Sequence, residues 1–253
     1  MSMKYLFSTL FISSCLILGG CDIVGDLLYP PDVYFKSFVY EYANVDYSQL
    51  PEVEVWNKTI AIALPQMICA RQNVWGRGDI DVQKLHTKHQ EISQRNGDID
   101  FNRWEHSDHG LHPNVRVWNT DTPFSAITVV SSADFDAGHP SGTFLNDVID
   151  IEYYTYRFYI ENGYKHTDPE RMYVSNDYSG DAVTKSLLEW GKEDSKFMDN
   201  KLYHIGLSDA FEPTFTLTFT SVPTLEQHHS ITVSIIIDGE EPYVFECEMD
   251  FAE

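Results

Sequence analysis

Apolar and polar residues alternate over much of the second half of this chain, which is the pattern of β-strands with one buried face. Residues 214–220 place Phe and Leu side chains on one face and four threonines on the other. Residues 231–237 and 243–251 repeat the alternation, and the second run carries acidic residues on its polar face. Asp238-Gly239 between these runs is typical of a tight hairpin turn. We therefore predict a half-buried antiparallel hairpin at the C-terminal end.

The same period of two predicts further strands in the rest of the chain. They cover residues 33–42, 59–64, 114–118, 126–131 and 151–160, while residues 184–200 are ambiguous between strand and helix. About seven or eight short strands without regular alternation of strand and helix indicate an all-β protein. We expect an antiparallel immunoglobulin-like β-sandwich, with a closed barrel as the alternative.

One stretch, residues 71–113, is polar and interrupts the strand pattern. It contains five of the ten histidines, and apolar positions within residues 81–92 recur at helical spacing, which predicts a short amphipathic helix. The rest is expected to be a long loop, and loops of that length in compact domains are often functional. We therefore expect a single β-sandwich domain over residues 32–253, with a long polar, partly helical insertion at 71–113.

Residues 1–20 have the layout of a secretory signal, with Lys4 as a small positive region and an apolar stretch at 5–18. That stretch is shorter than the roughly 18–20 residues a membrane-spanning helix needs. The sequence Leu-Gly-Gly-Cys follows at residues 18–21 and resembles the lipobox of a bacterial lipoprotein. The resemblance implies cleavage before Cys21 and lipidation of its thiol and new amino group. An ordinary signal peptide followed by an incidental cysteine is the alternative.

Residues 21–31 are expected to be the lipidated cysteine and a tether that ends in two prolines, which favour an extended chain. A cysteine that carries two or more acyl chains is a sufficient membrane anchor. The expected partner on this side of the protein is therefore a membrane, reached through the lipid.

Residues 131–147 and the hairpin at 229–251 resemble segments of uncharacterised surface lipoproteins of Bacteroidota. The resemblance implies a secreted sandwich of unknown function and supplies no catalytic residues. Within that group, an acidic residue such as Asp22 directly after the lipidated cysteine implies export to the outer membrane. The expected location is therefore the outer membrane, on its periplasmic face or at the cell surface.

The formal net charge of the 253-residue chain is −22 at pH 7, and the acidic residues are spread along the sequence. A field of that sign repels phosphate backbones. We therefore expect no nucleic-acid partner.

Two of the four cysteines remain after Cys15 leaves with the signal and Cys21 is lipidated. An exported protein favours a disulfide between the remaining pair, Cys69 and Cys247. Two buried thiols that behave as small hydrophobic groups are the alternative. The sequence leaves both open.

His106, His109 and His112 stand at intervals of three and are the sharpest candidates for a metal site. Imidazole is a common zinc ligand, although no established zinc spacing is present. A polar surface loop is the alternative. We expect no cofactor, and zinc at these histidines or calcium at a short acidic pair are the departures left open. Those pairs are Asp79 with Asp81, Asp98 with Asp100, and Asp134 with Asp136.

Trp75 and Trp104, both within the polar insertion, are candidates for ligand contact. Packing under a loop is the alternative, because Trp is usually buried on most of its surface. The leading hypothesis is a lipid-anchored cell-envelope protein that binds a protein or a glycan, or serves as a subunit of an assembly, and is not an enzyme. The alternative is a metal-dependent hydrolase that uses the three histidines.

Overall fold

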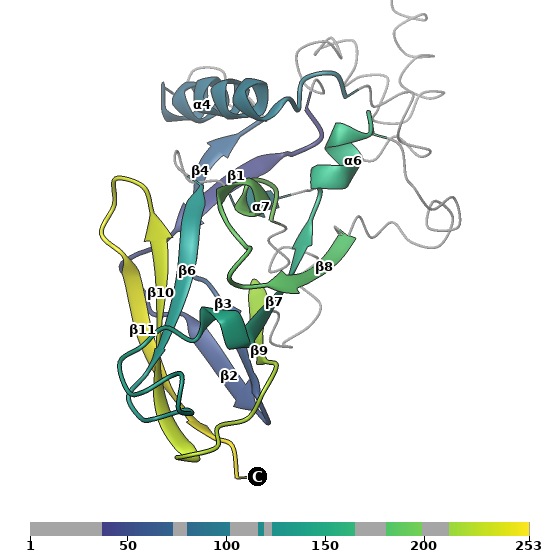
Figure 1. The fold of residues 1–253 in the computed structure, drawn as a ribbon. Helices are drawn as coiled ribbons and strands as arrows, with labels where there is room; N and C mark the ends of the chain where they lie inside the picture. The colour runs from purple at the N-terminus through teal and green to yellow at the C-terminus, as the bar shows by residue number, and fades with distance from the viewer. Residues whose placement is uncertain are drawn as a thin grey trace, which may run out of the picture.

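The computed structural model describes residues 37–72, 80–101, 116–118, 123–164, 181–198 and 213–252. These residues form more strand than helix, and helices of different lengths lie between the strands in the sequence (Figure 1). The strands are β1 (Glu41–Val45), β2 (Glu52–Trp56), β3 (Thr59–Ala63), β4 (Gln66–Arg71), β5 (Arg116–Trp118), β6 (Phe124–Ser131), β7 (Ile149–Thr155), β8 (Asp181–Ser186), β9 (Phe215–Phe219), β10 (His228–Ile237) and β11 (Tyr243–Asp250). The helices are α4 (Ile80–Asn96), the short η1 (Asn146–Val148), α6 (Arg157–Glu161) and α7 (Lys192–Ser195).

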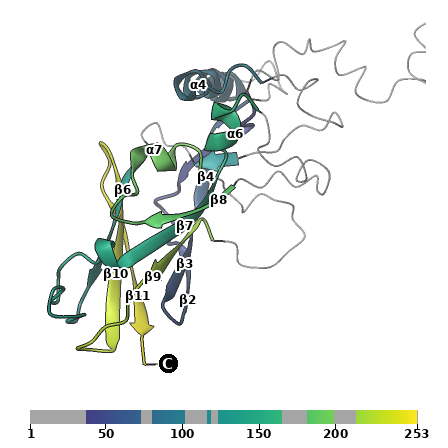
Figure 2. The same ribbon diagram turned by 45° about the vertical axis from the view of Figure 1, so that its right-hand side comes forward.

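Two antiparallel sheets form a sandwich-like body, which confirms the predicted fold class at this level. One sheet has the strand order β2-β3-β9-β7-β8, and the other has the order β11-β10-β6. Every neighbouring pair in both sheets is antiparallel. Figures 1 and 2 show the two sheets facing each other, with α4 and α6 gathered at one end.

A third sheet with the order β4-β1-β5 lies at that end. β1 pairs antiparallel with β4 and parallel with β5. Helix α4 packs against β4 and confirms the helix predicted over residues 81–92, although it is longer at both ends. From the described part of the polar insertion, Ile92 and Phe101 belong to a second hydrophobic cluster.

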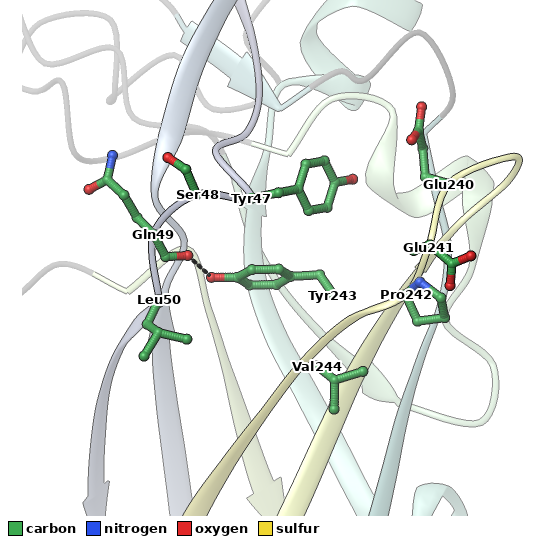
Figure 3. Close-up of a pocket in the computed structure, with 9 residues that line it drawn as sticks. All are labelled: Tyr47, Ser48, Gln49, Leu50, Glu240, Glu241, Pro242, Tyr243 and Val244. Carbon is green, nitrogen blue, oxygen red and sulfur yellow. Dashed lines mark hydrogen bonds between the residues drawn. The ribbon is translucent and has the colours of Figure 1, made fainter.

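One long ribbon connects the third sheet to the sandwich, because β1 and β4 form one half of it and β2 and β3 form the other. Between these halves, residues 46–51 on one strand lie opposite only residues 64–65 on the other. Pro51 and Pro65 both lie at this break, where proline cannot donate to a ladder of hydrogen bonds. The longer segment, residues 46–51, bends out of the ribbon, and we call it the ribbon excursion. Figure 3 shows part of it beside the β10–β11 hairpin.

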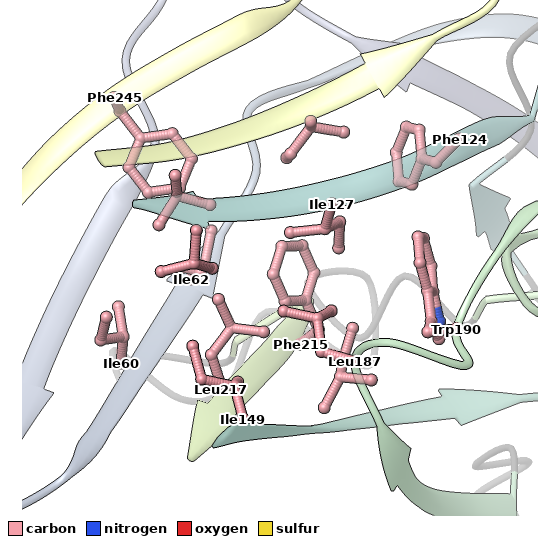
Figure 4. Close-up of a cluster of buried hydrophobic side chains, with 14 of the residues drawn as sticks. Ile60, Ile62, Phe124, Ile127, Ile149, Leu187, Trp190, Phe215, Leu217 and Phe245 are labelled. Atoms are coloured by element: carbon pink, nitrogen blue, oxygen red, sulfur yellow. The ribbon is translucent and has the colours of Figure 1, made fainter. Parts of the chain in front are cut away.

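The main core lies between the two sheets of the sandwich. β10 buries four aliphatic side chains on its inner face, and β9 buries Phe215, Leu217 and Phe219 with at most 1% of each exposed. Figure 4 shows the side chains of β6 and β11 facing those of β3, β7 and β9. Each such side chain contributes about 1.5–3 kcal/mol when it is fully buried. The alternation predicted for the C-terminal hairpin is therefore confirmed as the pattern that fills this core.

Two strand predictions were wrong at their ends. The strand predicted over residues 151–160 ends at Thr155, and α6 follows. Tyr156, Tyr159 and Ile160 are all buried at helical spacing, so the aromatic residues that suggested a strand pack from a helix instead. The strand predicted over residues 33–42 begins only at Glu41, within the described part of the chain.

A buried carboxylate explains why that first strand starts late. Asp98, just after α4, accepts hydrogen bonds from the backbone N–H of Phe38 at 2.8 Å and of Val39 at 2.9 Å. It also accepts one from the Tyr164 hydroxyl at 2.9 Å. The ring of His89 donates through Nε2 to the Val39 carbonyl at 2.8 Å, because a carbonyl oxygen can only accept. The backbone of Phe38 and Val39 is therefore held by side chains of the α4 region, whereas the Tyr40 carbonyl accepts from the backbone N–H of Gln72, just after β4.

Asp98 and His89 give the free energy of unfolding two opposing dependences on pH. Burial raises the pKa of Asp98 from 3.8 to about 6, and burial lowers the pKa of His89 from 6.5 to about 4. Between pH 6.5 and 4 the native state takes up a proton at Asp98 before the unfolded state does, so acid adds stability there. At His89 the unfolded state takes up the proton first, so acid removes stability.

The variant Asp98→Asn removes the first of these effects and leaves the second. We expect its free energy of unfolding to fall more steeply than that of the wild type between pH 6.5 and 4, by about 2 kcal/mol in total. Chemical denaturation followed by tryptophan fluorescence at a series of pH values measures this difference. Parallel pH profiles for the two proteins would contradict the assignment.

Candidate functional site

A pocket of about 470 Å³ lies where residues 46–50 of the ribbon excursion meet the turn between β10 and β11 (Figure 3). This volume is within the range of roughly 300–1,000 Å³ that is typical of ligand sites. Nine residues line it: Tyr47, Ser48, Gln49, Leu50, Glu240, Glu241, Pro242, Tyr243 and Val244.

Two tyrosines, one from each side, hold the walls of the pocket together. The Tyr243 hydroxyl donates a hydrogen bond to the Gln49 carbonyl at 2.8 Å. The Tyr47 and Tyr243 rings lie edge to face, with centroids 5.8 Å apart and planes at 74°. Tyr243 is only 6% exposed, whereas Tyr47 is 46% exposed. Tyr243 therefore fixes the geometry, and Tyr47 presents a ring surface to a ligand.

Asp46 makes the excursion a compact turn. Its carboxylate accepts hydrogen bonds from the Ser48 backbone N–H at 3.1 Å and from the Ser48 hydroxyl at 2.6 Å. It accepts a third from Gln49 Nε2 at 2.5 Å. These bonds lower the pKa of Asp46, with the Ser48 hydroxyl as the largest cause. An aspartate that bonds to the backbone two residues ahead stabilises a turn, so this wall is ordered without a ligand.

The charge of the pocket is negative. Glu240 and Glu241 lie side by side at the hairpin tip, and none of the nine lining residues is Lys, Arg or His. Burial, and then the charge of Glu240, raises the pKa of Tyr47. Burial, and then the charge of Asp46, raises the pKa of Tyr243 to about 12. Both tyrosines are therefore neutral at physiological pH, and the charge of the pocket comes from carboxylates.

The rim of the pocket is apolar. Leu50 is 79% exposed and Val244 is 48% exposed, and Figure 3 shows both below the two tyrosine rings. A pocket that combines exposed apolar side chains with a few polar groups is typical of a recognition site.

Most of the site residues predicted from the sequence lie outside the described residues. These are Cys21, Trp75, Trp104, His106, His109 and His112. Within the described ranges, no group of three or more His, Cys, Asp or Glu side chains is placed to hold a metal ion. Over the same ranges, no helix is long and apolar enough to cross a membrane.

The acidic pairs considered for calcium have protein partners where the structure describes them. Asp134 accepts a hydrogen bond from the backbone N–H of Ser141 at 2.7 Å. Asp136 accepts one from the N–H of Gly138 at 2.7 Å and contacts His139 Nδ1 at 2.8 Å. Asp98 is fully buried against the backbone of the N-terminal segment. These carboxylates therefore organise the chain locally.

His139 is held between two carboxylates in the connection between β6 and β7. Its Nδ1 contacts Asp136, and its Nε2 lies 3.1 Å from Asp147. The hydrogen bond with Asp136 raises the pKa of His139, and Asp147 adds to the effect. The ring also packs edge to face on buried Phe135. We interpret this cluster as a brace for the connection between β6 and β7.

A serine and a histidine lie close together elsewhere, but both are buried. Ser131 Oγ is 2.6 Å from His229 Nδ1, and the two residues are 2% and 0% exposed. His229 Nε2 donates to the Glu226 carbonyl at 2.9 Å, so Nδ1 accepts from the serine. The pair joins β10 to β6 and is closed to a substrate.

Cys69 and Cys247 carry thiols in the structure, and no disulfide joins them. Cys69 belongs to the second cluster, beside α4, whereas Cys247 packs at the edge of the main core. Burial raises the pKa of Cys247 to about 11, which makes it an unreactive thiol. Cys69 is buried and Cys247 is partly buried.

The pocket was not predicted from the sequence. Tyr243 fitted the pattern of a core position, and Glu240 and Glu241 directly follow the predicted turn at Asp238-Gly239. For the other wall, Asp46 followed by Ser48 two residues later is a pattern typical of a turn, and Tyr47 lies inside this turn. That pattern gives the turn but not the hairpin it meets, because the two walls are almost 200 residues apart in sequence.

Comparison with known proteins gives no relative: no protein-family model matches the chain, and neither a curated protein nor a solved structure matches it. The class of protein must therefore be argued from the fold and the pocket.

Proposed function

We propose that this protein is a lipid-anchored protein of the cell envelope that binds a partner through the pocket between Tyr47 and Tyr243. The observation that carries the proposal is the pocket itself. It is ordered by Asp46 and by the Tyr243 hydrogen bond, yet it keeps Tyr47 and Leu50 exposed. Exposed aromatic and apolar side chains on a rigid frame are typical of binding surfaces.

The proposal includes an immunoglobulin-like arrangement of the sandwich. The order β2-β3-β9-β7 corresponds to strands A-B-E-D of that fold, with β8 added at the edge. The order β11-β10-β6 corresponds to strands G-F-C. In such domains binding loops cluster at the end that carries the F–G turn, and the pocket uses the equivalent turn between β10 and β11.

The anchor is proposed from Cys21 and its flanking sequence. The 16 residues that follow Cys21, up to Ser37, span at most about 55 Å when fully extended. Asp98 holds the backbone of Phe38 and Val39, so the described part of the chain is firmly attached near its start. A tether of this kind lets the pocket reach a partner in the envelope while the lipid stays in the membrane.

The anchor is tested by labelling cells with an alkyne analogue of palmitate. We expect the wild-type protein to take up the label and to fractionate with membranes, because Cys21 is the acceptor. The variant Cys21→Ser should lose both properties, while the control Cys69→Ser keeps them. A labelled Cys21→Ser protein, or an unlabelled wild type, would overturn the anchor.

The binding function is tested by placing a photo-crosslinking amino acid at position 50 in the producing cells. We expect a crosslinked adduct at this position that disappears in the variant Tyr47→Leu, because the ring forms part of the same surface. Position 144 is the matched control, since Phe144 is 63% exposed and lies in the connection between β6 and β7. Equal yields at both positions, or no adduct at position 50, would contradict the proposed site.

A further inference from the structure

We propose that the pocket receives an arginine side chain, flanked by apolar residues, from a partner protein. This inference rests on the proposed function and gives the chemistry of its ligand. It follows from the charge of the pocket, from its aromatic surface and from the hydrogen bonds that its other polar groups already make.

The charge favours a cation. Glu240 and Glu241 are adjacent and exposed, and in the described part of the chain no basic side chain pairs with either carboxylate. The chain as a whole carries a net charge of −22, so its field attracts cationic ligands. The two carboxylates on this turn add to the negative potential of the pocket, which favours a cationic ligand.

The aromatic surface favours a planar cation. Tyr47 is about half exposed, and the charge of Glu240 acts on its hydroxyl. A guanidinium group can lie on a tyrosine ring while its N–H groups bond to a neighbouring carboxylate. An ammonium group on lysine is a strongly hydrated point charge without this planar fork. Arginine therefore fits the combination of ring and carboxylates better than lysine.

The neutral polar groups of the pocket argue against a sugar. The Ser48 hydroxyl and Gln49 Nε2 already donate to Asp46, and the Tyr243 hydroxyl already donates to a backbone carbonyl. The hydrogen-bond sites left to a ligand are mainly acceptors, because ionised carboxylates only accept and a hydroxyl that already donates can still accept. A guanidinium group offers five donors and no acceptor, so it matches the hydrogen-bond acceptors that remain in the pocket.

The rim indicates what flanks the arginine. Leu50 and Val244 are exposed beside the rings, and apolar neighbours on the partner would cover them. Arginine and tyrosine are also the residue types that are enriched among the strongest contacts of protein interfaces.

The test is an NMR titration of the ¹⁵N-labelled full-length protein in a neutral detergent. The probes are the blocked peptides Leu-Arg-Leu, Leu-Lys-Leu and Leu-Gln-Leu, together with the neutral sugar maltotetraose. We expect the arginine peptide to shift the amide signals of Tyr47 and Glu240 with a Kd of about 1 mM, a weak affinity suited to one side chain. The glutamine peptide should bind at least about tenfold more weakly, which corresponds to the loss of one charged contact.

Variants show whether the pocket itself is responsible. The double change Glu240→Gln and Glu241→Gln should weaken binding of the arginine peptide about tenfold, and so should Tyr47→Leu. Tyr47→Phe keeps the ring and should keep the affinity. Glu152→Gln is the matched control, because it removes the same charge from an exposed position on β7 and should change nothing.

The inference would be overturned if the arginine peptide bound the double variant as tightly as the wild type. It would also be overturned if Glu152→Gln weakened binding of this peptide as much as the double change does. Maltotetraose that shifts the same signals without any response to the arginine peptide would overturn it as well and would indicate a glycan site. The crosslinking result at position 50 tests the binding function separately from the identity of the ligand. An adduct there without arginine binding leaves the binding function in place and rejects only this ligand.

Discussion

Two sheets of this protein share one bent β-ribbon, and the position of the pocket follows from that bend. β1 pairs with β4 in the third sheet, and the same ribbon continues as β2 and β3 in the sandwich. Pro51 and Pro65 interrupt the ladder between its halves, and residues 46–51 leave the ribbon where only two residues oppose them. The Tyr243 hydroxyl then fastens this excursion to the far hairpin. Without the break the strand would continue, and no second wall would face β10 and β11.

The second cluster stabilises the start of that ribbon. Tyr42 on β1 points into the cluster under α4, whereas Val45 on the same strand points into the main core. A buried carboxylate is unfavourable unless hydrogen bonds satisfy it, and Asp98 has three donors. The strand is thus held in two cores at once, which keeps the excursion after Val45 in a defined place.

The sequence was a good guide where a strand has one buried and one exposed face, as in β9, β10 and β11. It failed for β2, because Glu52, Glu54 and Trp56 leave this edge strand without a clear buried face. It also failed at α6, where aromatic residues suggested a strand although their burial follows a helical period. The third sheet and the pocket depend on contacts between distant segments, such as β1 with β5 and Gln49 with Tyr243. Periodicity within a short window cannot report such contacts.

The central claim is that the pocket exists before any ligand arrives, because Asp46 and Tyr243 order its walls. Nuclear Overhauser contacts between the Tyr47 and Tyr243 rings in the ligand-free protein measure this directly. The edge-to-face arrangement, with ring centroids 5.8 Å apart, predicts clear cross-peaks between the two rings. A Tyr47 ring with no contact to Tyr243 would show that the wall is not ordered in the free protein, and it would contradict a preformed site.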